Sequence, residues 1–390
     1  MISATSRPYI DASVPVLRAH GVTITTTFYR NMFAAHPELN NLFNMGNQAS
    51  GAQQQSLAAA VFAYASHIDN PAALAPVISR IVHKHVSLGI KPEHYPIVGR
   101  YLLGAIQETL GDAATPPLLA AWDEAYNSLA NLFIEQEKTM YAQAGITPGA
   151  TRPMRVVALR QESADVRSLT LEPDDGQPAP AFRPGQYVSC AVTFDDGSHQ
   201  LRQYSLSDAP RDGQIRISVK RERATNANPQ GQVSNWIHER VALGSVLQVS
   251  HPFGDFTPDT ESNQPIVLLS AGVGITPMIA TLNRIAQVNP GRHVIFAHAA
   301  RGAEHHAHQA DLAAAQAVMP NLQNITFYES APGQGLMDAA LLPTWSRGAT
   351  DVYMCGPSAF MRAQWQALLA LGVPPTRLHR EVFGPDLLDI

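Results

Sequence analysis

The spacing of hydrophobic and polar positions divides the chain into three segments. Residues 1–145 carry long apolar stretches with helical periodicity, such as AQQQSLAAAVFAYASHI and PLLAAWDEAYNSLANLFIEQEKTMYAQA, and contain no credible strand. After a Gly/Pro junction at 144–153, the period becomes two in MRVVALRQ, SLTLEP, QYVSCAVTF, QIRISVKRE and SVLQVSHP, which predicts a small antiparallel β-barrel over 152–258. The strands PIVLLS, HVIFAHA, ITFYES and DVYMCG then alternate with helical patterns such as HHAHQADLAAAQAV, which predicts an α/β domain with a parallel sheet over 264–390.

Composition supports several folded domains and narrows the class of protein. With 390 residues, 45% hydrophobic and 15% charged, the chain can bury sizeable cores and is not disordered. A net charge of −5 without a Lys/Arg-rich run argues against nucleic acid or an anionic membrane as a partner. Cys190 and Cys355 form neither a disulfide framework nor a zinc pattern. No signal peptide is visible, and the most apolar stretch is too short and too broken to span a bilayer, so we expect a cytoplasmic protein.

Two histidines in RIVHKHVSLG raise the question of a metal site. His83 and His85 are two positions apart in a helical pattern, so they point to roughly opposite faces and cannot chelate one ion together. His85 shares its face with Ile78 and Val82 and is expected to face the core, whereas His83 shares its face with Ser87 and is expected to face water. A core-facing histidine is more often structural than a metal ligand, so spacing alone leaves both interpretations of His85 open.

The third segment carries a nucleotide-binding pattern. The turn SAGVGITPM follows an apolar strand and opens a helix, with Thr276 suited to the N-cap and Pro277 to the first turn. Its glycines allow a pyrophosphate close to the backbone and the helix N-terminus. A later apolar strand ends in CGP, and the combination resembles the NAD(P)H-binding half of the ferredoxin–NADP reductase superfamily. The expected contacts are Gly272, Val273, Gly274, Ile275, Thr276, Pro277, Cys355, Gly356 and Pro357.

The second segment resembles the FAD domain of the same superfamily through RQYSLS and GQVSNWIH. Arg202 offers a charged fork to phosphate, while Tyr204 and Ser205 offer a stacking ring and a hydroxyl to the flavin. The GQVS stretch opens a helix whose first amides can hold the FAD pyrophosphate. The expected FAD contacts are Tyr187, Arg202, Gln203, Tyr204, Ser205, Gly231, Gln232, Val233 and Ser234.

The whole chain resembles the flavohaemoglobins. The matching stretches are TFYRNMF, PELNNLFNMGNQ, KHVSLGIKPEHYPIVG, LANLFIEQE and EVFGPD, spread from the first segment to the last. The resemblance implies a globin domain with haem b, an FAD-binding barrel and an NAD(P)H-binding α/β domain. It also implies a nitric oxide dioxygenase, in which haem-bound dioxygen converts nitric oxide to nitrate with electrons passed from NAD(P)H through FAD. The alternatives are an oxygen-binding or redox-sensing globin with a reductase, and a haem- or flavin-dependent hydroperoxide reductase.

The resemblance assigns roles on the proximal side of the haem. His85 matches the ligand to iron, and Tyr95 and Glu137 match the residues that hydrogen-bond to that ligand. Glu135 is a competing carboxylate two positions from Glu137, and the family pattern favours Glu137. Lys84 precedes the ligand and is expected either near a haem propionate or in solvent.

Further roles follow for the distal side and the C-terminus. Tyr29 and Gln53 match the pair that hydrogen-bonds to bound dioxygen, Leu57 matches the apolar residue above the iron, and Phe43 matches the phenylalanine that packs on the haem. In EVFGPD, Phe383 would shield the flavin, while Glu381 would polarise the gap between haem and flavin or be a surface carboxylate. The C-terminal contacts expected are Glu381, Val382, Phe383, Gly384 and Pro385.

The choice of electron donor rests on one basic residue. Arg301 follows the strand HVIFAHA, where NADPH enzymes often bind the 2′-phosphate, but no second basic residue or serine stands beside it. NADH is therefore the expected donor and NADPH the weaker alternative. Oxygen, nitric oxide and NAD(P)H are the expected small-molecule partners of a monomer, and a lipid in the distal pocket is left open.

Overall fold

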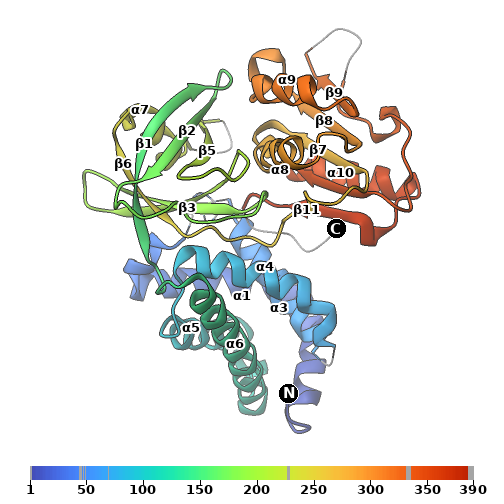
Figure 1. Cartoon of the computed structure of the whole chain (residues 1–390). Helices are drawn as coiled ribbons and strands as arrows, with labels where there is room; N and C mark the ends of the chain where they lie inside the picture. Colours follow the sequence, from blue (N-terminus) through green and yellow to red (C-terminus); the bar gives the residue numbers. More distant parts are fainter. Residues whose placement is uncertain are drawn as a thin grey trace. The chain divides into compact units, whose positions relative to one another are not determined.

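The computed structural model of the chain describes residues 2–43, 46, 48, 50–68, 70–225, 229–330 and 335–384 (Figure 1). The chain forms two compact units. The first consists mainly of residues 1–150, together with 191–201 and Gly384, and the second mainly of residues 151–383. None of the described helices is both long enough and apolar enough to cross a membrane.

The first unit is helical over its described N-terminal part, as the sequence predicts. Its elements are α1 (Arg7–Ala35), η1 (Pro37–Asn41), α3 (Ala52–Ser66), α4 (Pro71–Leu88), α5 (His94–Leu110), η2 (Gly111–Ala113) and α6 (Pro116–Ala144). Helices α4 and α6 end where Gly89 and Gly145 adopt left-handed φ angles of 75° and 66°, which side chains rarely tolerate. A large core joins α1 to α5 and α6 through residues such as Phe28, Ile106 and Trp122.

An antiparallel sheet begins the second part of the chain. Its elements are β1 (Thr151–Gln161), β2 (Val166–Pro173), β3 (Tyr187–Thr193), β4 (His199–Ser205), β5 (Ile215–Lys220), α7 (Gln232–Arg240) and β6 (Val246–Ser250). The strands follow the order β4-β3-β6-β1-β2-β5. Strand β4 carries the RQYS motif and adds a sixth strand to the five that periodicity predicts.

A parallel sheet of five strands follows, in the order β11-β10-β7-β8-β9. Its strands and helices are β7 (Ile266–Ala271), α8 (Ile275–Val288), β8 (Val294–Ala300), α9 (Gln309–Val318), β9 (Leu322–Tyr328), β10 (Asp351–Cys355), α10 (Ser358–Ala370) and β11 (Leu378–Glu381). Short 3₁₀ turns are η3 (Gly272–Gly274), η4 (Ala303–His305), η5 (Ala339–Leu341) and η6 (Pro375–Arg377). Strand β11 is not among the strands that the sequence predicts.

Helices cover both faces of the parallel sheet, and this explains its unbroken hydrophobic strands. Every residue of β7 and β8 is buried. Along β7, Ile266 and Leu268 pack with α8 and α9, whereas Val267 and Leu269 pack on the opposite face with α10. The carboxyl ends of β7, β8 and β10 therefore meet at one edge, where nucleotides bind in such sheets.

The helix predicted from HHAHQADLAAAQAV begins later than expected. Helix α9 starts at Gln309, because His308 adopts a positive φ of 62° that no α-helix accepts. His305 instead ends the short turn η4. Periodicity does not reveal this break, since the histidines fit a helical pattern equally well.

Candidate functional site

Helix α4 places His85 beside a buried carboxylate. The Nδ1 atom of His85 lies 2.8 Å from Glu137 Oε1 and 3.1 Å from the Tyr95 hydroxyl, and that hydroxyl donates a 2.5 Å hydrogen bond to the same Oε1. Glu137 lies on α6 and is only 2% exposed. Because Nδ1 is engaged, Nε2 is the ring nitrogen left to bind a metal.

The aromatic residues around this triad keep it rigid. The Tyr126 hydroxyl donates to the Tyr95 carbonyl at 2.6 Å, and the Phe133 ring packs edge-on against His85 with a centroid separation of 5.7 Å. Burial and the hydrogen bond to Glu137 both raise the pKa of Tyr95, so the phenol stays protonated and acts as a donor. Glu135 is exposed, so the competing carboxylate is not part of the triad.

The two faces of α4 differ less in solvent exposure than the sequence predicts. His83 and His85 are both half-buried. Ser87, expected on the water-facing side, is only 3% exposed, and that expectation is wrong. The reason is that α6 covers the end of α4, where the Tyr141 hydroxyl donates to the carbonyls of Val86 and Ile90. Lys84, between the two histidines, donates to the Gly384 carbonyl within the first unit.

A second set of polar and aromatic residues lies on α1 and α3. Tyr29 is 4% exposed and has a side-chain hydrogen bond with Gln53. The rings of Phe33 and Phe43 lie 5.7 Å and 5.8 Å from that of Tyr29. Burial raises the pKa of Tyr29 more than its bond with Gln53 lowers it, so the phenol is a protonated donor. Leu57, one helical turn after Gln53, is half-buried against the same core.

These residues fit a haem. Phe43, Leu57 and Val61 are apolar and only half-buried against the core of the helical unit, which suits the edges and faces of an apolar macrocycle. The donor set is one imidazole with its second nitrogen fixed, which is a common axial ligand of haem iron. The same unit also contains the hydrogen-bonded pair Tyr29 and Gln53.

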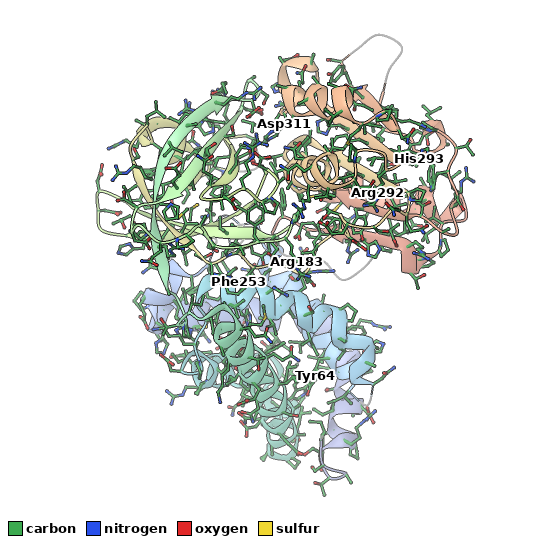
Figure 2. The ribbon with its side chains drawn as sticks, viewed as in Figure 1. Tyr64, Arg183, Phe253, Arg292, His293 and Asp311 are labelled. Carbon is green, nitrogen blue, oxygen red and sulfur yellow. The ribbon has the colours of Figure 1, made fainter. Side chains whose placement is uncertain are left out.

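The FAD-motif residues lie on β3 and β4. Tyr187 is 8% exposed and exchanges backbone hydrogen bonds of 2.8 Å and 2.9 Å with Phe253, the residue labelled in Figure 2. Gly254 has a φ of 128°, and a Cβ there would lie 3.1 Å from the Tyr187 ring. On β4, Arg202, Gln203 and Tyr204 are half-buried and Ser205 is buried, and burial raises the pKa of Tyr204. Tyr204 is therefore a neutral aromatic residue suited to stacking.

The GQVS turn has a geometry that requires glycine. Gly231 is the N-cap of α7, and a Cβ there would lie 2.9 Å from the Cβ of Glu222. Ser234 is buried and its hydroxyl accepts from the Glu222 amide. Asn235 donates 2.8 Å hydrogen bonds to the carbonyls of both Glu222 and Gly231. The sequence motif did not single out Asn235, although its place directly after GQVS is a signal that could have done so.

The two nucleotide motifs meet at the edge of the parallel sheet. A Cβ on Gly274 would lie 2.3 Å from the Cys355 carbonyl oxygen, so the GVG and CGP turns touch and leave no room for a side chain. The prediction that Thr276 is the N-cap is wrong, because η3 runs directly into α8 and Gly274 takes that position. The Thr276 hydroxyl donates to the Val273 carbonyl at 3.1 Å, and Pro277 lies in the first turn as predicted.

The residues of EVFGPD continue from β11. Glu381 is 7% exposed and pairs in register with Cys355, so it is not a surface carboxylate. Its Oε1 accepts from the Val382 amide at 3.0 Å, and its charge adds to burial in raising the pKa of the Cys355 thiol. Phe383 is 46% exposed. Pro385 lies outside the described residues.

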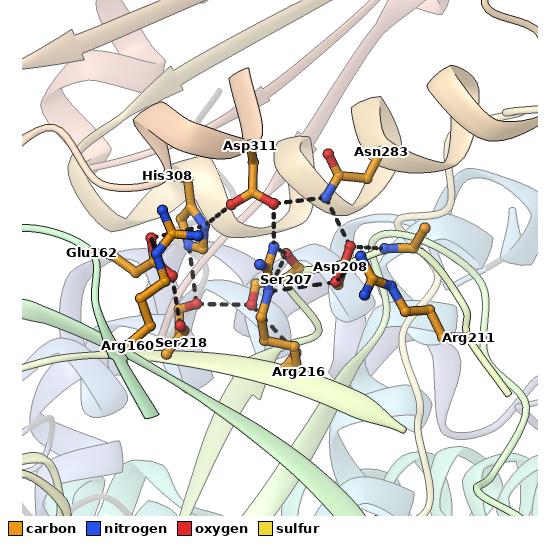
Figure 3. Close-up of polar contacts among 12 residues, drawn as sticks. Arg160, Glu162, Ser207, Asp208, Arg211, Arg216, Ser218, Asn283, His308 and Asp311 are labelled. Atoms are coloured by element: carbon orange, nitrogen blue, oxygen red, sulfur yellow. Dashed lines mark hydrogen bonds and ion pairs between the residues drawn. The ribbon is translucent and has the colours of Figure 1, made fainter. Parts of the chain in front are cut away.

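A buried polar network joins the antiparallel sheet to α8 and α9 (Figure 3). Arg216 on β5 donates to Asp311 at 3.0 Å, and Asn283 on α8 donates to both Asp311 and Asp208 at 3.0 Å and 2.8 Å. His308 is fully buried and lies 2.9 Å from Asp311 and 3.0 Å from the Ser218 hydroxyl. Burial raises the pKa of Asp311, but His308 and Arg216 outweigh it and hold that pKa well below its usual value.

This network also contains three potential metal ligands whose ligand atoms lie within 4.8 Å of one another, Glu162, His308 and Asp311. Each already has a partner: Glu162 accepts from Ser168 at 2.6 Å, and Asp311 accepts from Arg216. The arrangement is that of an ion-pair and hydrogen-bond network that fixes one lobe of the second unit against the other.

Comparisons with known proteins agree with this geometry. Residues 26–132 match the Globin family, residues 153–257 the oxidoreductase FAD-binding domain and residues 268–366 the oxidoreductase NAD-binding domain. These matches confirm the predicted fold class and the predicted haem, FAD and nicotinamide cofactors.

Solved structures show the same architecture. A flavohemoglobin from Malassezia yamatoensis, solved with bound FAD and haem, has a TM-score of 0.87 at 30% identity and covers 98% of this chain and 100% of its own. The FAD/NAD-binding domain of a nitric oxide dioxygenase from Vibrio cholerae O1 biovar El Tor has a TM-score of 0.56 at 37% identity and covers 60% of this chain and 100% of its own.

Curated relatives extend over the full length. The flavohemoprotein of Bordetella parapertussis is 46% identical over 98% of this chain and 99% of its own, and that of Chromobacterium violaceum is 48% identical over 98% of both. Because relatives this similar cover nearly the whole chain, the protein belongs to the flavohaemoprotein family.

Proposed function

We propose that this chain is a nitric oxide dioxygenase that draws electrons from NAD(P)H and converts nitric oxide and dioxygen to nitrate. The observation that carries the proposal is the hydrogen-bonded pair of buried Tyr29 and half-buried Gln53, in a chain that also holds the anchored His85 and two reductase motifs. The Vibrio cholerae protein with the similar FAD/NAD-binding domain is named a nitric oxide dioxygenase.

When bound, FAD would supply the change from hydride to single-electron transfer, and haem would supply the centre for oxygen. His85 would hold the iron through Nε2. Glu137 accepts from Nδ1 and makes the imidazole a stronger electron donor, while Tyr95 keeps that carboxylate in place. Because His85 Nδ1 and the Tyr95 hydroxyl both bind Glu137 Oε1, the orientation of the imidazole ring is fixed.

In the same helical unit, Tyr29 would donate to a small ligand held by the haem, and Gln53 would orient the phenol. Preorganised donors of this kind stabilise negative charge that develops during reaction. Tight holding of oxygen suits an enzyme that turns over repeatedly, and it is unfavourable for an oxygen carrier, which must release its ligand. Leu57 and Phe43 would keep water away from this ligand.

In the second unit, Arg202 and the first amides of α7 would hold the FAD phosphates, and Tyr187 and Tyr204 would contact the flavin. The touching GVG and CGP turns would seat the nicotinamide nucleotide, with Phe383 covering the flavin and Glu381 beside the reacting rings. We extend the proposal to a monomer acting in a reducing compartment, the cytoplasm, since both Cys190 and Cys355 are free and buried.

The test uses the purified full-length protein loaded with haem and FAD. Under air with nitric oxide, nitrate should accumulate at two per NADH consumed, because a hydride carries two electrons and each nitrate needs one. NADH consumption that does not respond to nitric oxide, without nitrate, would refute the proposal. His85→Ala should lose the haem Soret band and keep the flavin absorbance, and a normal haem spectrum in that variant would disprove the ligand assignment.

A further inference from the structure

The place where the adenosine ribose would lie can be located from the sheet. Strands β7 and β8 are adjacent and parallel, with Ala271 paired to Ala299, so the GVG turn and the end of β8 share one edge. In dinucleotide-binding folds the pyrophosphate sits at the first turn and the ribose lies over the end of a neighbouring strand. There an acidic residue binds the 2′-hydroxyl of NADH, or an arginine binds the 2′-phosphate of NADPH. The residues directly after β8 therefore determine which nucleotide fits.

Arg301, the first residue after β8, is held by a carboxylate from another element. Its guanidinium lies 3.1 Å from Asp165 Oδ2 and 3.1 Å from His305 Nδ1. Asp165 lies in the turn between β1 and β2, and its side chain is only 12% exposed. The neighbouring Ala164 amide donates to the Glu304 carbonyl at 2.8 Å, which fixes the turn against the end of β8. The arginine that could bind a 2′-phosphate is thus already paired with a carboxylate, while its own side chain is 63% exposed.

Glu304 presents the opposite charge at the same place. A Cβ built on Gly302 would lie 2.7 Å and 2.8 Å from the two Glu304 carboxylate oxygens and 2.9 Å from the Ser330 hydroxyl. The carboxylate is therefore folded back over the end of β8 rather than extended away from it. Its side chain is 66% exposed, so it faces solvent, from which a nucleotide would approach. The Ser330 amide donates to the Arg301 carbonyl at 2.9 Å, which keeps this hydroxyl at the same edge.

We propose that Glu304 and Asp165 make this protein specific for NADH over NADPH. Glu304 accepts hydrogen bonds from the ribose hydroxyls of NADH and repels a 2′-phosphate. Asp165 is a positioning residue, since it acts by keeping the Arg301 guanidinium away from that phosphate. The inference rests on the proposed function insofar as the second unit must be reduced by a nicotinamide nucleotide.

The experiment compares kcat/KM for NADH and NADPH in flavin-dependent ferricyanide reduction by the holoprotein, without nitric oxide. An exposed charge pair accounts for up to about a 5-fold effect, so wild type, with two such carboxylates at this edge, should prefer NADH about 10-fold. Glu304→Gln should raise kcat/KM for NADPH about 5-fold and lower that for NADH about 2-fold to 3-fold, because an acceptor is weakened. Asp165→Asn should raise kcat/KM for NADPH about 5-fold by releasing Arg301.

A double-mutant cycle isolates the arginine. In the wild-type background, Arg301→Ala should change the ratio of kcat/KM for NADPH to that for NADH by less than about 2-fold. In the Asp165→Asn background, the same substitution should abolish the increase in kcat/KM for NADPH. Asp174→Asn is the matched control. Asp174 also pairs with an arginine, but it comes directly after β2, whereas Asp165 comes directly before it. Calorimetric titration with 5′-AMP and with adenosine 2′,5′-bisphosphate gives a readout independent of turnover, and the two variants should gain affinity only for the bisphosphate.

A wild-type preference for NADPH would overturn the proposal, as would NADPH to NADH ratios within about 2-fold of wild type in both Glu304→Gln and Asp165→Asn. Failure of both nucleotides to reduce the flavin would refute this inference and the proposed function together. A protein that prefers NADH, responds to the variants as described and forms no nitrate would refute the proposed function alone.

Discussion

Acidification is expected to destabilise the second unit through two buried histidines on and beside β8. His298 is fully buried with Nδ1 2.9 Å from the Ser270 hydroxyl, and His306 is 3% exposed with Nδ1 2.8 Å from the Tyr328 hydroxyl. Their rings lie 4.5 Å apart, and within the described part of the chain neither Nε2 atom has a hydrogen-bond partner. A proton on either ring would have no acceptor and would face a second imidazole.

The magnitude follows from the shift in pKa. Burial, followed by the charge of His308, lowers the pKa of His306 from 6.5 to about 4, and burial lowers that of His298 as well. Below pH 6.5 the unfolded chain binds a proton on His306 that the folded chain does not bind. The contribution of neutral His306 to the free energy of unfolding is therefore fully present above pH 6.5 and is lost as the pH falls towards 4. For His306 alone, the free energy of unfolding should fall by roughly 2 kcal/mol at about pH 5.

The assay is thermal or urea unfolding of the full chain, followed by the fluorescence of released FAD, from about pH 8 to about pH 5. His306→Asn keeps a polar side chain but cannot take up the proton, so its unfolding free energy should depend less on pH than that of wild type, by roughly 2 kcal/mol over this range. His293→Asn, at an exposed position labelled in Figure 2, is the control and should follow wild type. Identical pH dependence in His306→Asn and wild type would show that the buried imidazole is not the group responsible.

Three further predictions concern the haem and nucleotide sites. Glu137→Gln should retain haem but lower nitrate formation by about 10-fold to 100-fold, with a raised haem reduction potential; an unchanged potential would contradict the electron-donating role of the carboxylate. Tyr29→Phe should lower nitrate formation by roughly 100-fold and speed oxygen dissociation, while ferricyanide reduction stays at the wild-type rate; equal oxygen dissociation rates would argue against the phenol as donor. Gly274→Ala should lower flavin reduction by NADH at least about 10-fold and destabilise the second unit by about 2 kcal/mol, because its Cβ would collide with the Cys355 carbonyl. Normal NADH kinetics in that variant would mean that the two turns separate easily.

Local periodicity and the positions of glycines predict most of the helices and strands and the division into three domains. The helical period placed His85 on the inner side of α4, but its role depends on Glu137, which lies 52 positions later and has no periodic relation to it. The same limit applies to Asp165 and Arg301, which are 136 positions apart. Two details of the backbone cannot be predicted from the sequence, namely the start of α8 at Ile275 and the left-handed conformation of His308. Both depend on how neighbouring turns pack rather than on residue preference. The family resemblance predicts Glu137 as the partner of His85, but it does not predict Asp165 as the partner of Arg301.

The network around Asp311 limits how the reductase can be recombined. Its members come from β5, from the loop after β4 and from two helices of the parallel-sheet lobe, so neither lobe contains a complete set. A chimaera that took the antiparallel lobe from a protein without an arginine at position 216 would leave the Asp311 carboxylate buried beside His308 and short of a cation. Removing one partner of a buried ion pair usually costs several kcal/mol. An exchange of cofactor lobes between relatives therefore has to keep both Arg216 and Asp311.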